Sequence, residues 1–486
     1  MKKLGIDQRK SIGFQFVLEQ MTPDTPYGYD EIKGVKPYKR SEREELLREL
    51  YELGCVVQGM EEYTVEFGQL ERIMMTMKEV RGSLKKAKKM CLSDVEFFEL
   101  KSVLIQIDKM LPIFNELKTK LNLNYITLED VTNPLNVLDP EKKRIPSFYI
   151  SEAYSESLGK TRIRKKQIEV SLRQEHSEAK LQELGRERRE LVILEDEQEQ
   201  AVRIMLTEQI RGDLDLISEN LNMVGCLDFI IQKAKIAIKF HGIPPIITDS
   251  ELYFQSMQNP QIQDSLGAKG KKFAPVTIEM SEGVTVITGA NMGGKSVALR
   301  TVVLNLYLAQ CGFYVFSAEA KVPLLDYLFL IAEEFQSMKD GLSSFGGEIV
   351  RLKEALNEIP NGFGFLMLDE LARGTNPHEG AQIVRAVVRY LNTQKAMTLL
   401  ATHYDHVAEY ANRHYQVYGL KKKSMESMEQ ELSGLGEQER IDLIGRYMDY
   451  GIYRVLDQED CPRDAIHVCY LLGLQKEVLN YINTES

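Results

Sequence analysis

The eight residues from Gly289 to Ser296 read Gly-Ala-Asn-Met-Gly-Gly-Lys-Ser, and they constrain the fold more than any other stretch of this chain. They fit the pattern G-x-x-x-x-G-K-[ST], in which glycine-rich backbone closes around phosphate oxygens. A largely apolar run at 284–287 precedes the pattern, and a helix-like run at 297–308 follows it. A strand before the loop and a helix after it form the setting that phosphate binding needs, because a helix N-terminus carries partial positive charge. The pattern therefore predicts an α/β nucleotide-binding domain.

Each polar group of this loop has an expected partner. The Lys295 ammonium is predicted to reach the β- and γ-phosphates, and the Ser296 hydroxyl to bind Mg²⁺. A chance glycine-rich turn is the alternative, and two further segments described below argue against it. The residues predicted to contact the nucleotide are Gly289, Asn291, Met292, Gly293, Gly294, Lys295 and Ser296.

Two apolar segments end in polar residues suited to catalysis. Residues 365–368 predict a buried strand that is followed by Asp369 and Glu370. Asp369 suits a Mg²⁺ ligand, and Glu370 suits a base that orients an attacking water. Taken alone, two acids after a strand fit a solvated strand end equally well. Residues 399–401 predict another strand, and His403 after it is predicted to sense the γ-phosphate rather than to be only structural.

Together these segments resemble the ATPase domain of the MutS family. The matching residues are 288–296, 368–375 and 401–404, and the Asn-Met pair inside the loop separates this family from most other P-loop proteins. The resemblance implies ATP hydrolysis with Mg²⁺ on an ABC-like, mostly parallel sheet. Close matches cover roughly 270–410.

Smaller matches extend the resemblance. Residues 340–345 resemble a segment whose first serine, here Ser343, reaches the nucleotide of a partner subunit. Phe273 resembles an aromatic residue that packs on adenine. Residues 465–478 resemble the family's C-terminal dimerisation helices, which implies a homodimer or a heterodimer. The chain departs from the family at the end of the loop, which reads Lys-Ser-Val where the family usually has Lys-Ser-Thr. The sequence of 374–380 is more similar to the branch of the family that does not repair mismatches.

The periodicity of the remaining sequence predicts three segments. Residues 1–125 form an N-terminal helical core segment, 126–245 a helical core with lever helices, and 246–486 the P-loop ATPase domain. The predicted fold class is thus an α/β P-loop ATPase domain preceded by an all-α core and lever region. Ser41 and Glu44 fit a capping box at the start of a helical region that runs to about residue 121. An apolar stripe at helical spacing favours an intramolecular core over a binding face; its members are Leu206, Ile210, Leu214, Ile217 and Leu221.

Composition limits the partners. The net charge is −11, so any nucleic-acid footprint must be local. Residues 85–89 form one basic run, and 160–189 hold ten lysines and arginines against five acidic residues; solvated helix faces are the alternative for both. No apolar run of membrane-spanning length occurs, and the six cysteines lack the spacing of a metal or redox site. These features predict a cytoplasmic protein without a membrane partner.

Two functional classes remain open for this predicted ATPase. The mismatch repair enzymes of the family carry two domains before the helical core, and the space ahead of it here does not accommodate both. Phe97 and Glu99 share the spacing of a mismatch-reading wedge but lie in a helical run, which favours a structural role. The chain is therefore expected to couple ATP turnover to lever motion in a dimer acting on DNA structures without reading mismatches. The alternative is ATP-dependent remodelling of a protein client, and reduced proteins of this family suggest reactivation of a cobalamin-dependent aminomutase.

Overall fold

The computed structural model describes residues 3–289, 294–332, 344–420 and 448–456, with a few isolated positions between and beyond them. Contacts divide the chain into two compact units. One unit comprises residues 22–34 and 52–234; the other comprises residues 1–21, 35–51 and 235–486. These contacts do not test the predicted boundaries near 125 and 245, which stay predictions.

The first of these units is helical, as the periodicity predicts. Two helices extend across its limits, namely α4 (Arg43–Glu62) and α11 (Leu214–Lys239). Its other helices are α3 (Pro26–Gly34), α5 (Thr64–Met74), α6 (Arg81–Ala87), α7 (Asp94–Leu121), α8 (Thr132–Leu138), α9 (Glu156–Gln174) and α10 (Glu178–Arg211).

The core of the helical unit includes the stripe predicted from the sequence. All five of its residues, from Leu206 on α10 to Leu221 on α11, are at most 4% exposed. Phe97 on α7 is fully buried, and its ring centroid lies 5.1 Å from that of Phe148. The prediction that Phe97 is a structural residue is therefore confirmed.

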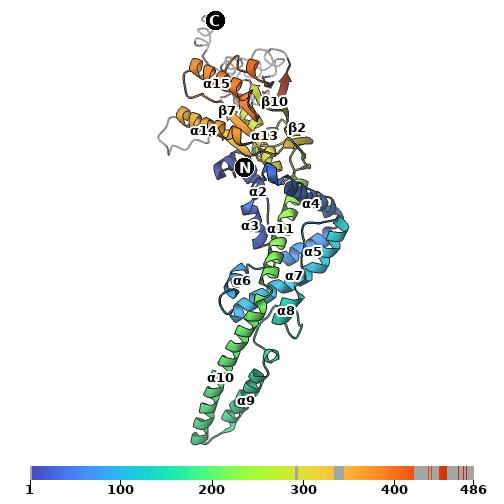
Figure 1. The fold of residues 1–486 in the computed structure, drawn as a ribbon, viewed down its shortest axis with the longest axis vertical. Helices are drawn as coiled ribbons and strands as arrows, with labels where there is room; N and C mark the ends of the chain where they lie inside the picture. The colour runs from blue at the N-terminus through green and yellow to red at the C-terminus, as the bar shows by residue number, and fades with distance from the viewer. Residues whose placement is uncertain are drawn as a thin grey trace. The chain divides into compact units, whose positions relative to one another are not determined.

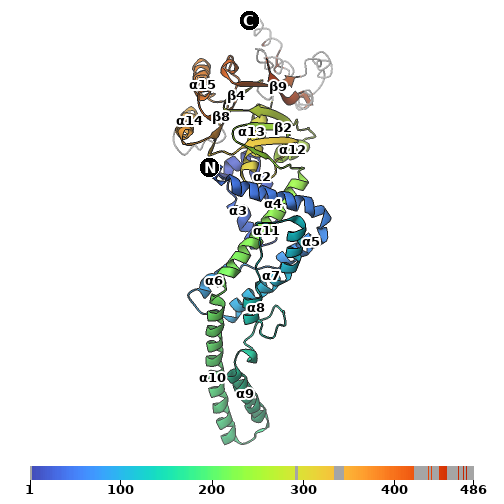
Figure 2. The same ribbon diagram turned by 45° about the vertical axis from the view of Figure 1, so that its right-hand side comes forward.

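Helices α9 and α10 form a hairpin (Figure 1, Figure 2). Basic residues of α9 form ion pairs with acidic residues of α10. The Arg162 guanidinium lies 3.0 Å from a Glu195 oxygen, and Lys165 pairs with the same carboxylate. Arg164 lies 2.6 Å from Glu187. The basic stretch identified in the sequence thus has acidic partners on the facing helix.

The predicted capping box at Ser41 and Glu44 is wrong. A 3₁₀ turn, Arg40–Glu42, precedes α4, and the Glu42 carboxylate accepts the Lys39 backbone N–H at 2.7 Å. The turn begins the helical segment earlier, so Glu42 rather than Glu44 satisfies the free N–H. A capping box does occur at Ser93 before α7.

The second unit contains the predicted α/β domain together with two N-terminal helices, α1 (Ile6–Ile12) and α2 (Phe14–Glu19). Its six-stranded sheet has the order β10-β9-β4-β8-β7-β6. The strands are β4 (Gly283–Thr288), β6 (Tyr327–Ile331), β7 (Gly364–Asp369), β8 (Ala396–Ala401), β9 (Arg413–Leu420) and β10 (Met448–Val455). All neighbours pair in parallel except β9 and β10, which are antiparallel. The prediction of a mostly parallel sheet is confirmed.

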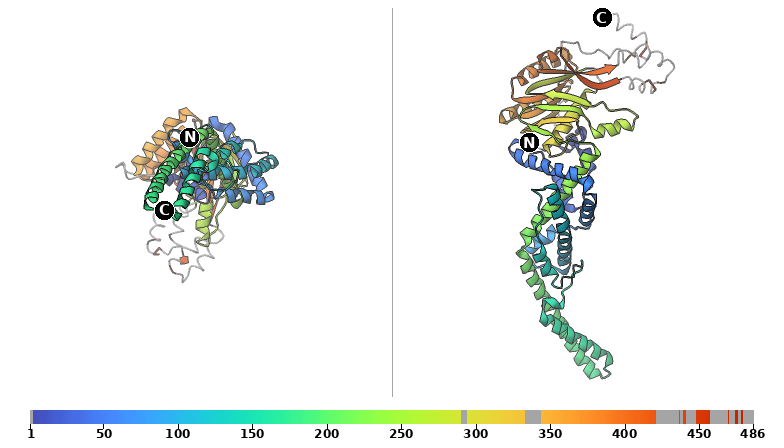
Figure 3. Two further views of the ribbon diagram at one scale, coloured as in Figure 1. Left: turned by 90° about the horizontal axis from the view of Figure 1, so that it is seen from below. Right: turned by 90° about the vertical axis from the view of Figure 1, so that its right-hand side faces the viewer.

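A second, four-stranded sheet has the order β1-β5-β2-β3. Its strands are β1 (Ile246–Thr248), β2 (Leu252–Met257), β3 (Val276–Met280) and β5 (Glu319–Pro323), and the short helix α12 (Pro260–Gly267) connects β2 to β3. The long helix α13 (Lys295–Gln310) contacts strands of both sheets (Figure 3).

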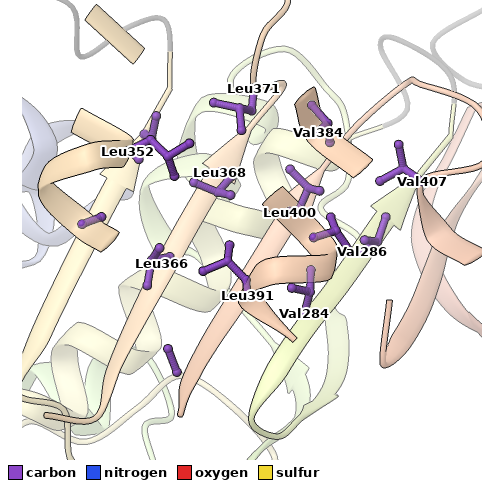
Figure 4. Packing of buried hydrophobic residues seen from close by; sticks show 14 of the residues in the cluster. Val284, Val286, Leu352, Leu366, Leu368, Leu371, Val384, Leu391, Leu400 and Val407 are labelled. Atoms are coloured by element: carbon purple, nitrogen blue, oxygen red, sulfur yellow. The ribbon is translucent and has the colours of Figure 1, made fainter. Parts of the chain in front are cut away.

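An apolar cluster joins one face of the six-stranded sheet to α14 (Ser344–Glu358) and α15 (Pro377–Leu391). Figure 4 shows Leu366, Leu368 and Leu400 from the strands facing Leu352 and Leu391 from the helices. This cluster fixes the carboxyl ends of the central strands, where the predicted site residues lie.

Candidate active site

The carboxyl ends of β4, β7 and β8 lie side by side at one edge of the six-stranded sheet. Ala401 on β8 pairs with Ile287 on β4 and, across its other edge, with Asp369 on β7. Three segments that are distant in the sequence therefore end at the same level, as the strand pattern predicts.

The phosphate-binding loop leaves β4 through Gly289 and enters α13 after Gly294. Both have backbone angles that disfavour a side chain, with φ of 131° and 93°. A Cβ at Gly289 would collide with the Val417 side chain, so this position requires glycine for space as well as for conformation. Residues Asn291, Met292 and Gly293 lie outside the described residues.

Lys295 lies at the start of α13 and is 4% exposed. Its ammonium donates a hydrogen bond to the Gly289 carbonyl at 2.9 Å and lies 3.6 Å from Oε1 of Glu370. The structure thus brings together the predicted phosphate-binding lysine and the predicted base.

Glu370 is held from several sides. Its backbone N–H donates to the Ala401 carbonyl at 3.0 Å, and its φ is 53°, in the left-handed region. Arg373 lies 3.0 Å from Oε2, and Nδ1 of His403 lies 3.9 Å from Oε1. Because its backbone is fixed, the carboxylate points toward Lys295 and His403 rather than along the strand.

The two residues predicted to bind Mg²⁺ are adjacent. Burial raises the pKa of the Asp369 carboxyl, and a hydrogen bond with Ser296 opposes this shift. Among the described residues, Oδ1 of Asp369 is a buried oxygen without a hydrogen-bond partner. A carboxylate oxygen beside a serine hydroxyl suits a divalent cation that keeps several waters.

Burial also lowers the pKa of the His403 imidazole, and the neighbouring Glu370 carboxylate opposes that shift. The side chain keeps 35% of its surface exposed, so solvent limits the effect. At neutral pH the ring is accordingly neutral, with one nitrogen that can donate and one that can accept a hydrogen bond.

A pocket of about 480 Å³ opens beside these groups. It connects the start of α13 with the segment that contains Phe273, which the resemblance places on adenine. Its lining comprises Ile262, Leu266, Lys269, Lys271, Lys272, Phe273, Ala274, Gly294, Lys295, Ser296, Val297, Glu370, Arg373 and Tyr450.

Sequence reasoning missed several of these lining residues. Lys269, Lys271 and Lys272 directly precede Phe273, and a basic run beside that aromatic could have drawn attention to them. Tyr450 comes from β10, and its ring lies against Gly294. No local pattern indicates that contact, because the place of β10 beside the loop depends on tertiary contacts such as its antiparallel pairing with β9.

Two predictions fall outside the described residues. Ser343 belongs to the undescribed 333–343 segment, and most of the predicted C-terminal dimerisation helices at 465–478 are likewise undescribed. Their proposed roles remain predictions.

Comparison with known proteins identifies the α/β part of the chain. The family model of MutS domain V matches residues 285–466. This range begins in β4 and contains Lys295, Ser296, Asp369, Glu370 and His403, but not Phe273. Residues 285–466 of this chain belong to the MutS domain V family.

Similar proteins carry two different descriptions. An endonuclease MutS2 from Acetivibrio thermocellus is 28% identical over 227 residues, which cover 46% of this chain and 28% of that protein. A DNA mismatch repair protein MutS from Fusobacterium nucleatum is 30% identical over 206 residues, covering 42% and 23% respectively. An endonuclease MutS2 from the same organism is 31% identical over 247 residues, covering 50% and 30%. The chain thus spans less than a third of the length of these relatives.

Within the ranges that the structure describes, no helix is both long and apolar enough to cross a membrane.

Proposed function

We propose that this protein hydrolyses ATP to ADP and phosphate with Mg²⁺. The observation that carries this proposal is the convergence of Lys295, Ser296, Asp369 and Glu370 at one edge of the sheet, beside a pocket lined by Phe273. The match to MutS domain V supports the same activity.

The chain's own residues supply binding and orientation. In the proposed complex Phe273 packs against the base, and Lys295 exchanges its contact with the Gly289 carbonyl for the β- and γ-phosphate oxygens. Glu370 accepts a hydrogen bond from the attacking water and orients it toward the γ-phosphorus. His403, neutral at pH 7, donates a hydrogen bond to a γ-phosphate oxygen as negative charge redistributes during bond cleavage.

Ser296 and Asp369 would hold the metal ion. Bound Mg²⁺ neutralises charge on the β- and γ-phosphates. The free Oδ1 atom of Asp369 and the adjoining serine hydroxyl are the protein groups that fit this role.

Substitution of Lys295 tests the proposal. The wild-type protein should release phosphate from ATP only when Mg²⁺ is present. Lys295→Ala should lower turnover at least about 100-fold, because the phosphates lose a buried cation. Lys353→Ala, an exposed position on α14, is the matched control. Failure of the wild-type protein to hydrolyse ATP would refute the proposal.

We further propose that the nucleotide cycle moves the lever helices in a dimer that acts on DNA structures. The similar proteins are named as an endonuclease and a DNA mismatch repair protein, which supports DNA as the client. We infer no mismatch reading, since Phe97 is a core residue. Affinities for homoduplex and single-mismatch DNA should agree within about threefold, against the roughly 1–3 kcal/mol per base pair that specific readers reach.

A protein client is the second candidate, and one observation favours it. Arg162, Arg164 and Lys165 already have carboxylate partners on α10, which reduces the charge available to phosphates. A DNA titration at several salt concentrations separates the two candidates. Binding to DNA should weaken steeply with salt, and replacing Arg162, Arg164, Lys165 and Lys166 with Gln should flatten the slope by up to about 0.9 per lost contact. Absence of DNA binding at low salt would leave the protein client.

A further inference from the structure

Glu348 is a buried carboxylate on α14 that lies outside the motifs on which the proposed ATPase function rests. It is 4% exposed and lies beside the apolar cluster that joins α14 to the sheet. A carboxylate rarely occupies such a position unless it accepts strong hydrogen bonds. Its carboxylate accepts a hydrogen bond from the backbone N–H of Ala372, at 2.9 Å, in the loop that follows Glu370.

That loop has an unusual backbone. Glu370 and Ala372 have φ angles of 53° and 63°, in the left-handed region that residues other than glycine and asparagine rarely adopt. Conformations of this kind persist only where neighbouring groups enforce them. The loop also carries the proposed base, so its backbone angles determine the direction of the Glu370 side chain.

Three hydrogen bonds from two segments hold the loop. The Ala401 carbonyl on β8 accepts the Glu370 N–H at 3.0 Å, and the Tyr404 hydroxyl donates to the Ala372 carbonyl at 2.8 Å. Glu348 provides the third contact, and it is the only one of the three that comes from α14. Gly380 on α15 leaves room for this arrangement, because a Cβ there would collide with the Tyr404 hydroxyl.

We propose that Glu348 is a positioning residue for ATP hydrolysis. Its carboxylate fixes the left-handed turn at Ala372 and thereby aims Glu370 at the attacking water. The contact also links α14 to the catalytic loop, so a displacement of α14 changes the orientation of Glu370. This inference rests on the proposed ATPase function and assigns a residue outside the loop, strand-end and histidine motifs on which that function rests.

The first test separates orientation from nucleotide binding. Glu348→Ala should lower kcat at least about tenfold while the Kd for ADP stays within about twofold, because Glu348 lies outside the pocket lining. Glu348→Gln retains an acceptor oxygen and should recover kcat to within about threefold of wild type. Glu354→Ala, an exposed position on the same helix, is the control and should be unchanged.

A double-mutant cycle shows whether Glu348 acts through Glu370. In a Glu370→Ala background the substitution Glu348→Ala should produce no further loss of the residual rate, since the group that it positions is already gone. Additive losses, wild-type turnover in Glu348→Ala, or weakened ADP binding with no rescue by Gln would each overturn the inference. ATP hydrolysis by the wild-type protein is measured first. Its absence would refute the proposed function, together with the inference that depends on it.

Discussion

Asp369 illustrates how a site residue can lower the stability of the fold that holds it. Its pKa is raised because the carboxylate is buried, so protons bind it more readily in the folded than in the unfolded protein. A group with a raised folded pKa contributes more stability as the pH falls toward that pKa, and less as the pH rises above it. The ionised form at neutral pH is therefore a cost that the proposed metal ion would offset.

This cost makes a prediction for Asp369→Asn. Without metal and nucleotide, the variant should be more stable than wild type at pH 8, by about 0.5–2 kcal/mol, the range that single stabilising substitutions commonly reach. The gain should shrink at pH 5.5, where wild-type Asp369 becomes easier to protonate. Urea unfolding at the two pH values measures the difference, and a variant less stable than wild type at pH 8 would contradict this explanation.

Although Asp369→Asn should raise stability, it should lower ATP turnover. Asp369→Asn should abolish Mg²⁺-dependent hydrolysis, because an amide is a weak ligand for a hard cation. In wild type, the Mg²⁺ concentration needed for half-maximal turnover should rise as the pH falls, since metal and proton compete for one carboxylate. An unchanged Mg²⁺ requirement between pH 8 and pH 6 would show that Asp369 does not bind the metal.

Sequence patterns located the central residues but not their supporting contacts. Lys295, Asp369 and His403 each follow or precede a buried strand, so local periodicity and the parallel-sheet rule suffice to bring them together. Glu348 lies in an amphipathic helix with nothing in its neighbourhood to distinguish it from Glu354. Its importance depends on a hydrogen bond to Ala372, and a contact of that kind cannot be predicted from periodicity.

At the scale of elements, the segment between α12 and β3 gives the pocket a distinctive charge. Lys269, Lys271 and Lys272 line it together with Lys295 and Arg373, and among the described lining residues Glu370 is the only acidic one. No ion pair among the described parts of the chain involves the first three lysines. In a protein of net charge −11, such a group favours attraction of a polyphosphate.

Replacing these three lysines with Gln should therefore weaken nucleotide binding. We expect the Kd for ATP to rise about three- to tenfold at 50 mM salt, and the dependence of the Kd on salt to become shallower. The turnover number should change less than about twofold, because the groups around the γ-phosphate remain. The control replaces Lys36, Lys353 and Lys395, which are exposed and outside the pocket lining. Equal effects of the two triple variants would remove any specific role for this segment.

Element type was predictable along most of the chain, while some element ends were not. The helices at 151–239 and the strands before Gly289, Asp369 and Thr402 follow from clear periodicity. The start of α4 could not be predicted from periodicity, because a 3₁₀ turn capped by Glu42 begins before the residues that best match a capping box. The contribution of Tyr450 could not be predicted either, since β10 follows residues with no strand pattern and its place beside the loop depends on its pairing with β9.

For the whole molecule, the proposal of a dimer depends on Ser343 and the C-terminal segment, both outside the described residues. If Ser343 completes the site of a partner subunit, a non-hydrolysable ATP analogue should shift the protein from monomer to dimer. Ser343→Ala should weaken that shift and lower turnover per subunit. Sedimentation velocity at micromolar concentration with and without the analogue measures it. A strict monomer with full ATPase activity would exclude a shared site.

The account as a whole depends on Glu370 acting as the base of an ATPase. The most direct test compares ATP binding and phosphate release in wild type and in Glu370→Ala, with Mg²⁺ present. We predict that the variant binds ATP with a Kd within about threefold of wild type and retains the nucleotide as ATP, while phosphate release falls at least about 100-fold. Phosphate release by Glu370→Ala at the wild-type rate would contradict the account.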